Sequence, residues 1–198
     1  MKLTVQRLLI FFLLIPLSIG FGFGYDAAAT AVEKKMYPIP SRYATLIEEQ
    51  AAEFGVPPSI VFAVVKCESE FEGDLLSENG AVGLMQITPQ QMSLVYTEVF
   101  HEPVPDAGIL YDPKTNLRIG TAWLSHLHQI YGVWDTVYAA WCAGIDTANT
   151  WLLDADVING QGRLERIPDK ATAKFVSNAK KSEEMYTKLY FSAPISES

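Results

Sequence analysis

An apolar helix that ends in a glutamate constrains the fold of this chain most. Prolines at positions 57 and 58 suit the first turn of a helix, and residues 60–65 (IVFAVV) are all apolar. Valines lie three, four and seven residues before Glu68, so this glutamate continues the buried side of the helix. Glu70 points away from that side, and Glu72 lies at or past the helix end. The pattern therefore predicts one glutamate held against the interior of a helical domain.

A carboxyl group in such a place resists ionisation, because burial disfavours its charged form. A carboxylic acid that stays protonated near neutral pH can donate its proton to the leaving oxygen of a glycosidic bond. A buried glutamate can also be structural, paired with a basic side chain. The helix alone leaves both interpretations of Glu68 open.

Caps, prolines and glycines divide the rest of the chain into helices. Ser41, Thr88, Asp112 and Asp135 are the expected N-terminal caps, and glycines at 55, 132 and 144 are expected to end helices. Residues 101–112 and 154–169 are predicted to be loops, the second with a small hairpin. No sustained alternation of β type occurs, so the fold class is predicted to be all-α. The expected helices span residues 41–54, 57–71, 88–100, 112–131, 134–144, 149–153 and 171–190.

The first 23 residues have the pattern of an export segment. Lys2 and Arg7 precede an apolar run over residues 8–23, and small residues suited to cleavage follow at 27–31. A removed signal peptide and a retained anchor that contacts the membrane through residues 8–23 both stay open, because a spanning helix needs about 20 residues. We expect 24–40 to be a linker, 41–191 the folded domain and 192–198 a tail. In both cases the domain is exported to the cell envelope.

Charge and composition exclude several classes of function. The net charge of −8, without clustered lysine and arginine, argues against nucleic acid as a partner. His126 and His128 lie two residues apart on a predicted helix and point to different sides, so they are poor joint metal ligands. Neither a phosphate-binding loop nor a serine nucleophile elbow occurs in the sequence. We expect no metal, no cofactor and a monomer.

A glycine-rich turn follows the glutamate helix. Gly80 and Gly83 allow tight backbone close to a ligand, and residues 84–87 (LMQI) offer an apolar wall with one amide. The order of residues through this turn resembles the signature of the soluble-lytic-transglycosylase-like (SLT) domain family. The residues that carry the resemblance are Glu68-Ser69-x-Phe71, then Ser77-x-x-Gly80-Ala81-Val82-Gly83-Leu84-Met85-Gln86-Ile87-x-Pro89.

Later segments resemble further motifs of that family in the same order, so the resemblance covers about residues 41 to 190. These segments are Tyr111-Asp112-Pro113 with residues 116–120, Ala139-Ala140-Trp141-Cys142-Ala143-Gly144 with Trp151, and Ile167-Pro168 with Thr172 and Phe175-Val176. The resemblance implies a lysozyme-like fold and cleavage of peptidoglycan between N-acetylmuramic acid and N-acetylglucosamine. It also implies a cleft lined or supported by Ser69, Ser77, Met85 and Gln86. From the residues alone, Ser69 can equally bond its own backbone, and Met85 can be ordinary core.

The family is understood to work with one glutamate, which Glu68 matches. That glutamate first protonates the leaving oxygen and then acts as base on the 6-hydroxyl of muramic acid, which closes a 1,6-anhydro ring. The attack is intramolecular, so its nucleophile is already tethered. No water takes part, and no second carboxylate has to hold one.

The chain departs from the family pattern at four positions. Trp141 and Cys142 stand where the family has tyrosine and asparagine, Phe175 replaces a tyrosine, and Ala171 replaces a glutamate. Trp141 keeps one N–H donor and either stacks on a sugar or fills the core. Cys67 precedes Glu68, so a disulfide between Cys67 and Cys142 beside the site is one expectation, and two small buried residues are the other.

We predict an exported, all-α, lysozyme-like domain that acts as a peptidoglycan lytic transglycosylase on the β-1,4 bond between MurNAc and GlcNAc. Two alternatives stay open. A hydrolytic muramidase would use Asp74 or Glu78 to hold water. A peptidoglycan-binding module without turnover would follow from the changes at Trp141, Cys142 and Phe175.

Overall fold

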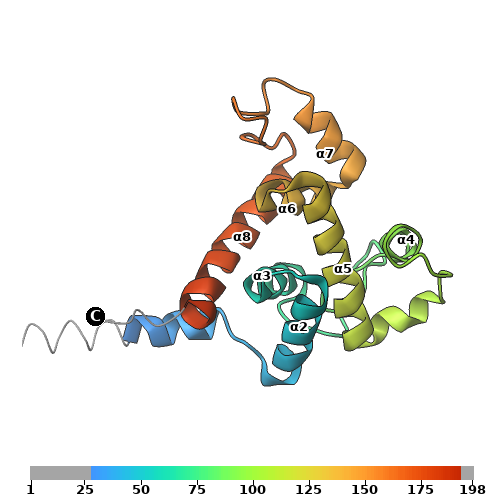
Figure 1. Ribbon diagram of the computed structural model, residues 1–198. Helices are drawn as coiled ribbons and strands as arrows, with labels where there is room; N and C mark the ends of the chain where they lie inside the picture. The colour runs from blue at the N-terminus through green and yellow to red at the C-terminus, as the bar shows by residue number, and fades with distance from the viewer. Residues whose placement is uncertain (1–27, 193–198) are drawn as a thin grey trace, which may run out of the picture. The chain divides into compact units, whose positions relative to one another are not determined.

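The computed structural model describes residues 28–192, and the chain from Ile39 onward forms one compact unit (Figure 1). Residues 28–36 are helical, so much of the segment expected to be a linker is a helix. The predicted export segment at residues 8–23 lies outside the described residues, as does the expected tail beyond residue 192. Within the described part of the chain, every helix is too short or too polar to cross a bilayer.

Helices make up nearly all of the regular structure, as predicted. The described residues contain isolated β-bridges but no strand, and one bridge, Ile158 to Leu164, lies in the loop where a small hairpin was expected. The all-α fold class is thereby confirmed. The elements are α2 (Ser41–Phe54), α3 (Pro58–Ser69), α4 (Pro89–Leu94), the π-helix η1 (Val95–Phe100), the 3-10 helix η2 (Ala107–Tyr111), α5 (Pro113–Tyr131), α6 (Trp134–Ala143), α7 (Ile145–Leu152), α8 (Lys170–Tyr186) and the π-helix η3 (Thr187–Phe191).

Two of the four predicted caps are confirmed. The side chains of Thr88 and Asp112 accept hydrogen bonds from the backbone N–H groups of Gln91 and Thr115, and a proline follows each cap. The prediction for Ser41 was wrong, because Pro40 holds the cap position and Ser41 is already helical.

The cap predicted at Asp135 was also wrong. Val133 is the cap residue of α6, and Asp135 lies inside the first turn, where a negative charge favours the helix dipole. Its carboxylate pairs with Lys180 on α8 at 2.6 Å. Helix α7 begins at Ile145, earlier than expected, because the chain re-enters a helix directly after Gly144.

Helix α3 is the centre of the domain. It packs against α2 and α8, while α5 packs against α2 and α6, so α3 lies between the two longest helices (Figure 1). Residues 59–65 are all buried, which explains why this helix is apolar on every side rather than on one face. Each buried valine, isoleucine or phenylalanine contributes roughly 1.5–3 kcal/mol to stability. Glu68 stands where this helix emerges from the core.

The backbone turns sharply just after Glu68. Glu70 and Phe71 have φ angles of 50° and 69°, a region that residues with side chains rarely adopt. The Phe71 ring is buried against Phe62, and the Arg42 guanidinium donates a hydrogen bond to the Phe71 carbonyl at 3.1 Å. Tertiary contacts therefore hold a strained turn in place. They also anchor the end of the helix that carries Glu68.

Candidate active site

Glu68 and Trp141 form the centre of the candidate site. The Trp141 indole N–H donates a hydrogen bond of 2.6 Å to the Glu68 carboxylate, which joins α6 to the end of α3. Trp141 is buried, and Glu68 is half-buried. Lys66, the basic residue nearest in sequence, pairs instead with Glu70 at 3.3 Å. The polar partner of Glu68 is thus an indole, whereas a structural glutamate would be paired with a basic side chain.

Burial raises the pKa of Glu68 from 4.5 to about 7, and the hydrogen bond from Trp141 opposes part of this rise. The two effects have opposite signs because burial disfavours the carboxylate, whereas an N–H donor stabilises it. At neutral pH both forms of the carboxyl group are populated. Such a group can donate a proton in one step and accept one in the next.

A groove of about 680 Å³ is lined by Trp141, the hydrogen-bond partner of Glu68. Trp141 and Cys142 line it near the end of α6, and Asp146 lines it in the first turn of α7. Helices α4 and η1 contribute Gln91, Leu94 and Glu98, and α5 contributes Trp123 and His126. Since Trp141 both lines the groove and bonds Glu68, the indole connects the groove to the carboxyl group.

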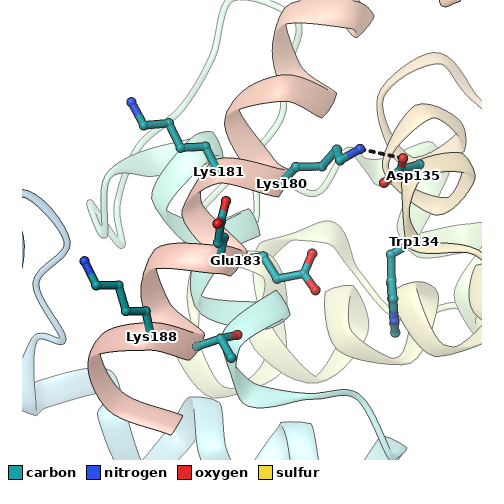
Figure 2. Close-up of a pocket in the computed structure, with 8 residues that line it drawn as sticks. Trp134, Asp135, Lys180, Lys181, Glu183 and Lys188 are labelled. Carbon is teal, nitrogen blue, oxygen red and sulfur yellow. Dashed lines mark hydrogen bonds and ion pairs between the residues drawn. The ribbon is translucent and has the colours of Figure 1, made fainter. Parts of the chain in front are cut away.

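A second hollow of about 720 Å³ lies along α6 and α8, and its lining includes neither Glu68 nor Trp141 (Figure 2). Its charges are balanced, because three lysines and three acidic residues line it. Figure 2 shows Lys180 reaching Asp135, and the Tyr138 hydroxyl donates to Glu183 at 2.7 Å. The groove beside Trp141 is therefore the stronger candidate for the site.

Ser69 connects the glutamate helix to the glycine-rich turn. Its hydroxyl lies 2.7 Å from the Leu84 carbonyl and 3.2 Å from the Val65 carbonyl, one turn back in α3. The bond to Val65 is the local bond to its own helix, and the shorter bond to Leu84 joins the end of α3 to the turn.

The predicted site residues of the turn direct their polar atoms inward. The Ser77 hydroxyl accepts from the Ala81 N–H at 3.0 Å, and the Gln86 amide donates to the carbonyls of Leu75 and Gly83 at 3.0 Å. Met85 is fully buried, and a Cβ at Gly120 would come within 3.1 Å of its Cβ. These residues fix the shape of the turn rather than present free donors at its surface.

Asn116 organises this turn, a role that its sequence context did not predict. Its side-chain oxygen accepts from the Met85 N–H at 2.9 Å, and its amide donates to the carbonyls of Val82 and Leu110 at 2.8 and 3.0 Å. Gly83 has a φ of 78°, and a Cβ there would lie 2.9 Å from the Asn116 side-chain carbon. The sequence did contain one signal of this role, namely a polar residue on the buried side of the helix that follows Asp112-Pro113.

We expect Asn116→Ala to lower the free energy of unfolding by about 3 kcal/mol or more, because three buried backbone groups lose their partner. Urea unfolding followed by circular dichroism measures this change. Asn178→Ala, at an exposed position on α8, is the matched control and should change stability by less than about 0.5 kcal/mol. Equal stability of the two variants would contradict the role given to Asn116.

The disulfide expected between Cys67 and Cys142 is absent, since both thiols are free. Each thiol faces a different part of α8: Cys67 lies 3.8 Å from the Ser182 hydroxyl, and Cys142 hydrogen-bonds Thr172. Ser182 and Thr172 are ten residues apart on α8, which corresponds to about 15 Å along the helix axis. Burial raises the pKa of both thiols. Cys142 is exposed and lines the groove, so the expectation of two small buried residues was wrong for Cys142.

The remaining candidates lie outside this arrangement. Phe175 is half-buried on α8, and Asp74 and Glu78 are exposed in the turn after α3. His126 stacks on Trp123 and His128 on Trp134, so the two imidazoles have separate surroundings. Among residues 28–192, no three His, Cys, Asp or Glu side chains gather in a way that could hold a metal ion.

Comparisons with known proteins point to lytic transglycosylases. The family model of the transglycosylase SLT domain matches residues 45–157. Solved structures that resemble the chain include the following two. An inactive glutamate-to-glutamine mutant of the lytic transglycosylase Slt from Pseudomonas aeruginosa has a TM-score of 0.69 and 28% identity, over 80% of this chain and 25% of that one. The 70 kDa soluble lytic transglycosylase of Escherichia coli has a TM-score of 0.70 and 27% identity, over 79% and 25%.

Two curated relatives are similar over most of this chain. The membrane-bound lytic murein transglycosylase C of Klebsiella pneumoniae is 26% identical over 162 residues, 79% of this chain and 42% of that protein. The soluble lytic murein transglycosylase of Escherichia coli K12 is 32% identical over 143 residues, 70% of this chain and 22% of that protein. The chain thus spans less than half the length of the curated relatives it matches.

Proposed function

The chain belongs to the transglycosylase SLT domain family, and from this premise we propose that it is a lytic transglycosylase that cleaves peptidoglycan. Its relatives are named as murein transglycosylases, both membrane-bound and soluble. The observation that carries the proposal is Glu68 itself. This carboxyl group has a pKa of about 7 and accepts a hydrogen bond from a buried indole that lines a groove.

Glu68 acts first as an acid. The protonated carboxyl group gives its proton to the glycosidic oxygen between MurNAc and GlcNAc, and the bond from that oxygen to the anomeric carbon of MurNAc breaks. Positive charge then develops on the muramic acid ring, and Glu68 is left as a carboxylate. The Trp141 N–H stabilises that carboxylate, because a charge-assisted hydrogen bond is about twice as strong as a neutral one.

Glu68 then acts as a base. The carboxylate takes the proton of the MurNAc 6-hydroxyl, and the oxygen of that hydroxyl bonds to the anomeric carbon of the same sugar. The product carries a 1,6-anhydro ring, and Glu68 is protonated again for the next cycle. A pKa near 7 suits both steps, since neither proton transfer is strongly uphill at neutral pH.

One observation favours this chemistry over hydrolysis by a second carboxylate. Hydrolytic glycosidases use two carboxyl groups, about 5–5.5 Å apart in retaining enzymes and about 6.5–9.5 Å apart in inverting ones, where the second group activates a water molecule. Asp74 and Glu78, the two candidates from the sequence, are exposed in the turn after α3, whereas Glu68 is half-buried. The inactive Pseudomonas aeruginosa Slt carries a glutamate-to-glutamine change, which supports an essential glutamate in this family.

The substitutions in the later motifs do not favour loss of turnover. Trp141 stands where the family has a tyrosine hydroxyl, and its N–H reaches Glu68. We propose that the indole N–H takes over the supporting role of that hydroxyl. We also propose that the domain works outside the cytoplasm, with residues 8–23 as a cleaved signal or an anchor, and that Glu68 and Trp141 are its principal site residues.

Incubation with isolated cell-wall sacculi tests the proposal. Mass spectrometry of the released muropeptides should show 1,6-anhydro-muramyl ends. Released fragments with reducing ends would indicate hydrolysis. If the protein is retained on sacculi and releases nothing, it is a binding module and the proposal fails.

A further inference from the structure

We propose that Glu98 and Asp146 make the groove selective, so that it prefers strands with amidated stem peptides over strands whose stem peptides carry carboxylates at the same positions. The inference rests on the proposed function, because it concerns the substrate of the same groove. Both side chains are exposed and line the groove, and neither takes part in the contacts of Glu68.

The two carboxylates come from separate parts of the chain that meet at the groove. Glu98 lies on η1, four residues after Leu94 and seven after Gln91, and this spacing directs all three to one side of the α4–η1 helix. Asp146 lies in the first turn of α7, five residues after Trp141. A substrate held at Trp141 for cleavage therefore extends past acidic groups on both segments.

Nothing in the groove offsets this negative charge. The described residues that line it include no lysine or arginine, and the one imidazole, His126, is stacked on Trp123. The second hollow differs in this respect, because its lysines equal its acidic residues in number (Figure 2). The excess of negative charge in the groove is therefore a local property and does not simply reflect the net charge of −8 of the whole chain.

The chemistry of the substrate gives this charge a consequence. Each MurNAc carries a lactyl group that bears the stem peptide, so cleavage beside MurNAc brings a peptide close to the groove. Carboxylates on that peptide are repelled by Glu98 and Asp146, whereas carboxamides of the same size are not. Like-charge repulsion between exposed groups is modest and weakens as salt screens it.

The inference is tested by removing negative charge from the substrate and from the groove, separately and together. Two synthetic glycan oligomers that differ only in carboxylate or carboxamide on their stem peptides are cleaved by wild type and by the Glu98→Gln/Asp146→Asn double variant. Wild type should cleave the amidated oligomer with a kcat/KM roughly three- to tenfold higher at low salt. The double variant should reduce this ratio to about one, and added salt should reduce the wild-type ratio as well.

A matched control removes the same charge elsewhere. Glu102→Gln/Asp156→Asn changes two exposed carboxylates that are not part of the groove lining, and it should keep the wild-type preference. If wild type cleaves both oligomers equally well, or if the control loses the preference as fully as the groove variant, the inference is wrong. If neither oligomer yields anhydro ends, the proposed function has failed instead.

Discussion

Glu68→Gln is expected to abolish release of muropeptides, with a loss of at least about a thousandfold in kcat, because an amide can neither donate the first proton nor accept the second. The glutamine side chain has the same size and can still accept the hydrogen bond from Trp141. Binding to sacculi should therefore survive. Release of soluble fragments and retention on sacculi are measured on the same samples.

The same variant should be more stable than wild type at alkaline pH. The pKa of Glu68 is about 7 in the folded protein and near 4.5 when unfolded, so the folded state holds this proton more tightly. Stability is then lost as pH rises from about 4.5 to above 7, at a cost of up to about 3 kcal/mol. At pH 8 the glutamine variant should unfold several degrees above wild type, and at pH 4 the two should coincide.

Glu72→Gln provides the control for both measurements. Glu72 is exposed just past the end of α3, in the turn that follows Glu68. Its substitution should leave activity unchanged and should not shift the melting temperature with pH. A Glu68→Gln protein that still cleaves sacculi would exclude Glu68 as the acid, whatever its stability.

Trp141→Phe is expected to lower kcat by about ten- to a hundredfold, because a hydrogen bond to a charged group is worth about 1.5–3 kcal/mol. The change keeps an aromatic ring and removes the N–H donor. Since this donor lowers the pKa of Glu68, its loss should raise that pKa above about 7. In the proposed mechanism cleavage starts from protonated Glu68, so the alkaline fall in activity should move to higher pH.

The pH profile separates this role from a packing defect. A variant that merely loosened the core would lose activity without moving the alkaline limb. Trp134→Phe makes the same substitution in the second hollow, where Trp134 stacks on His128, and should leave the profile in place (Figure 2). An unshifted pH profile in Trp141→Phe would mean that the indole does not lower the pKa of Glu68.

Much of the fold could be predicted because local signals agree with the tertiary structure. Thr88 and Asp112 each precede a proline, so cap and first turn indicate the same helix start. The uninterrupted apolar run of α3 indicates a central helix, and its spacing distinguishes Glu68 from Glu70. Ser41 shows the limit of such reasoning, because a proline directly before it took the cap position.

The site was less predictable because its contacts join residues far apart in sequence. Trp141 and Glu68 are 73 residues apart, and the sequence left stacking and core packing as the expected roles for the indole. The disulfide was inferred from two cysteines next to site motifs, yet each side chain faces its own partner on α8. Asn116 looked like one more helix residue until the backbone groups that it satisfies were located.

Cleavage in water enriched in heavy oxygen tests the central claim most directly. If Glu68 activates the 6-hydroxyl of MurNAc to attack the anomeric carbon of the same sugar, no oxygen from the solvent enters the product. We therefore predict that the newly formed muramyl ends released by wild-type protein carry no label. Labelled ends, heavier by the mass of one incorporated heavy-water molecule, would show that water is the nucleophile and would contradict the account.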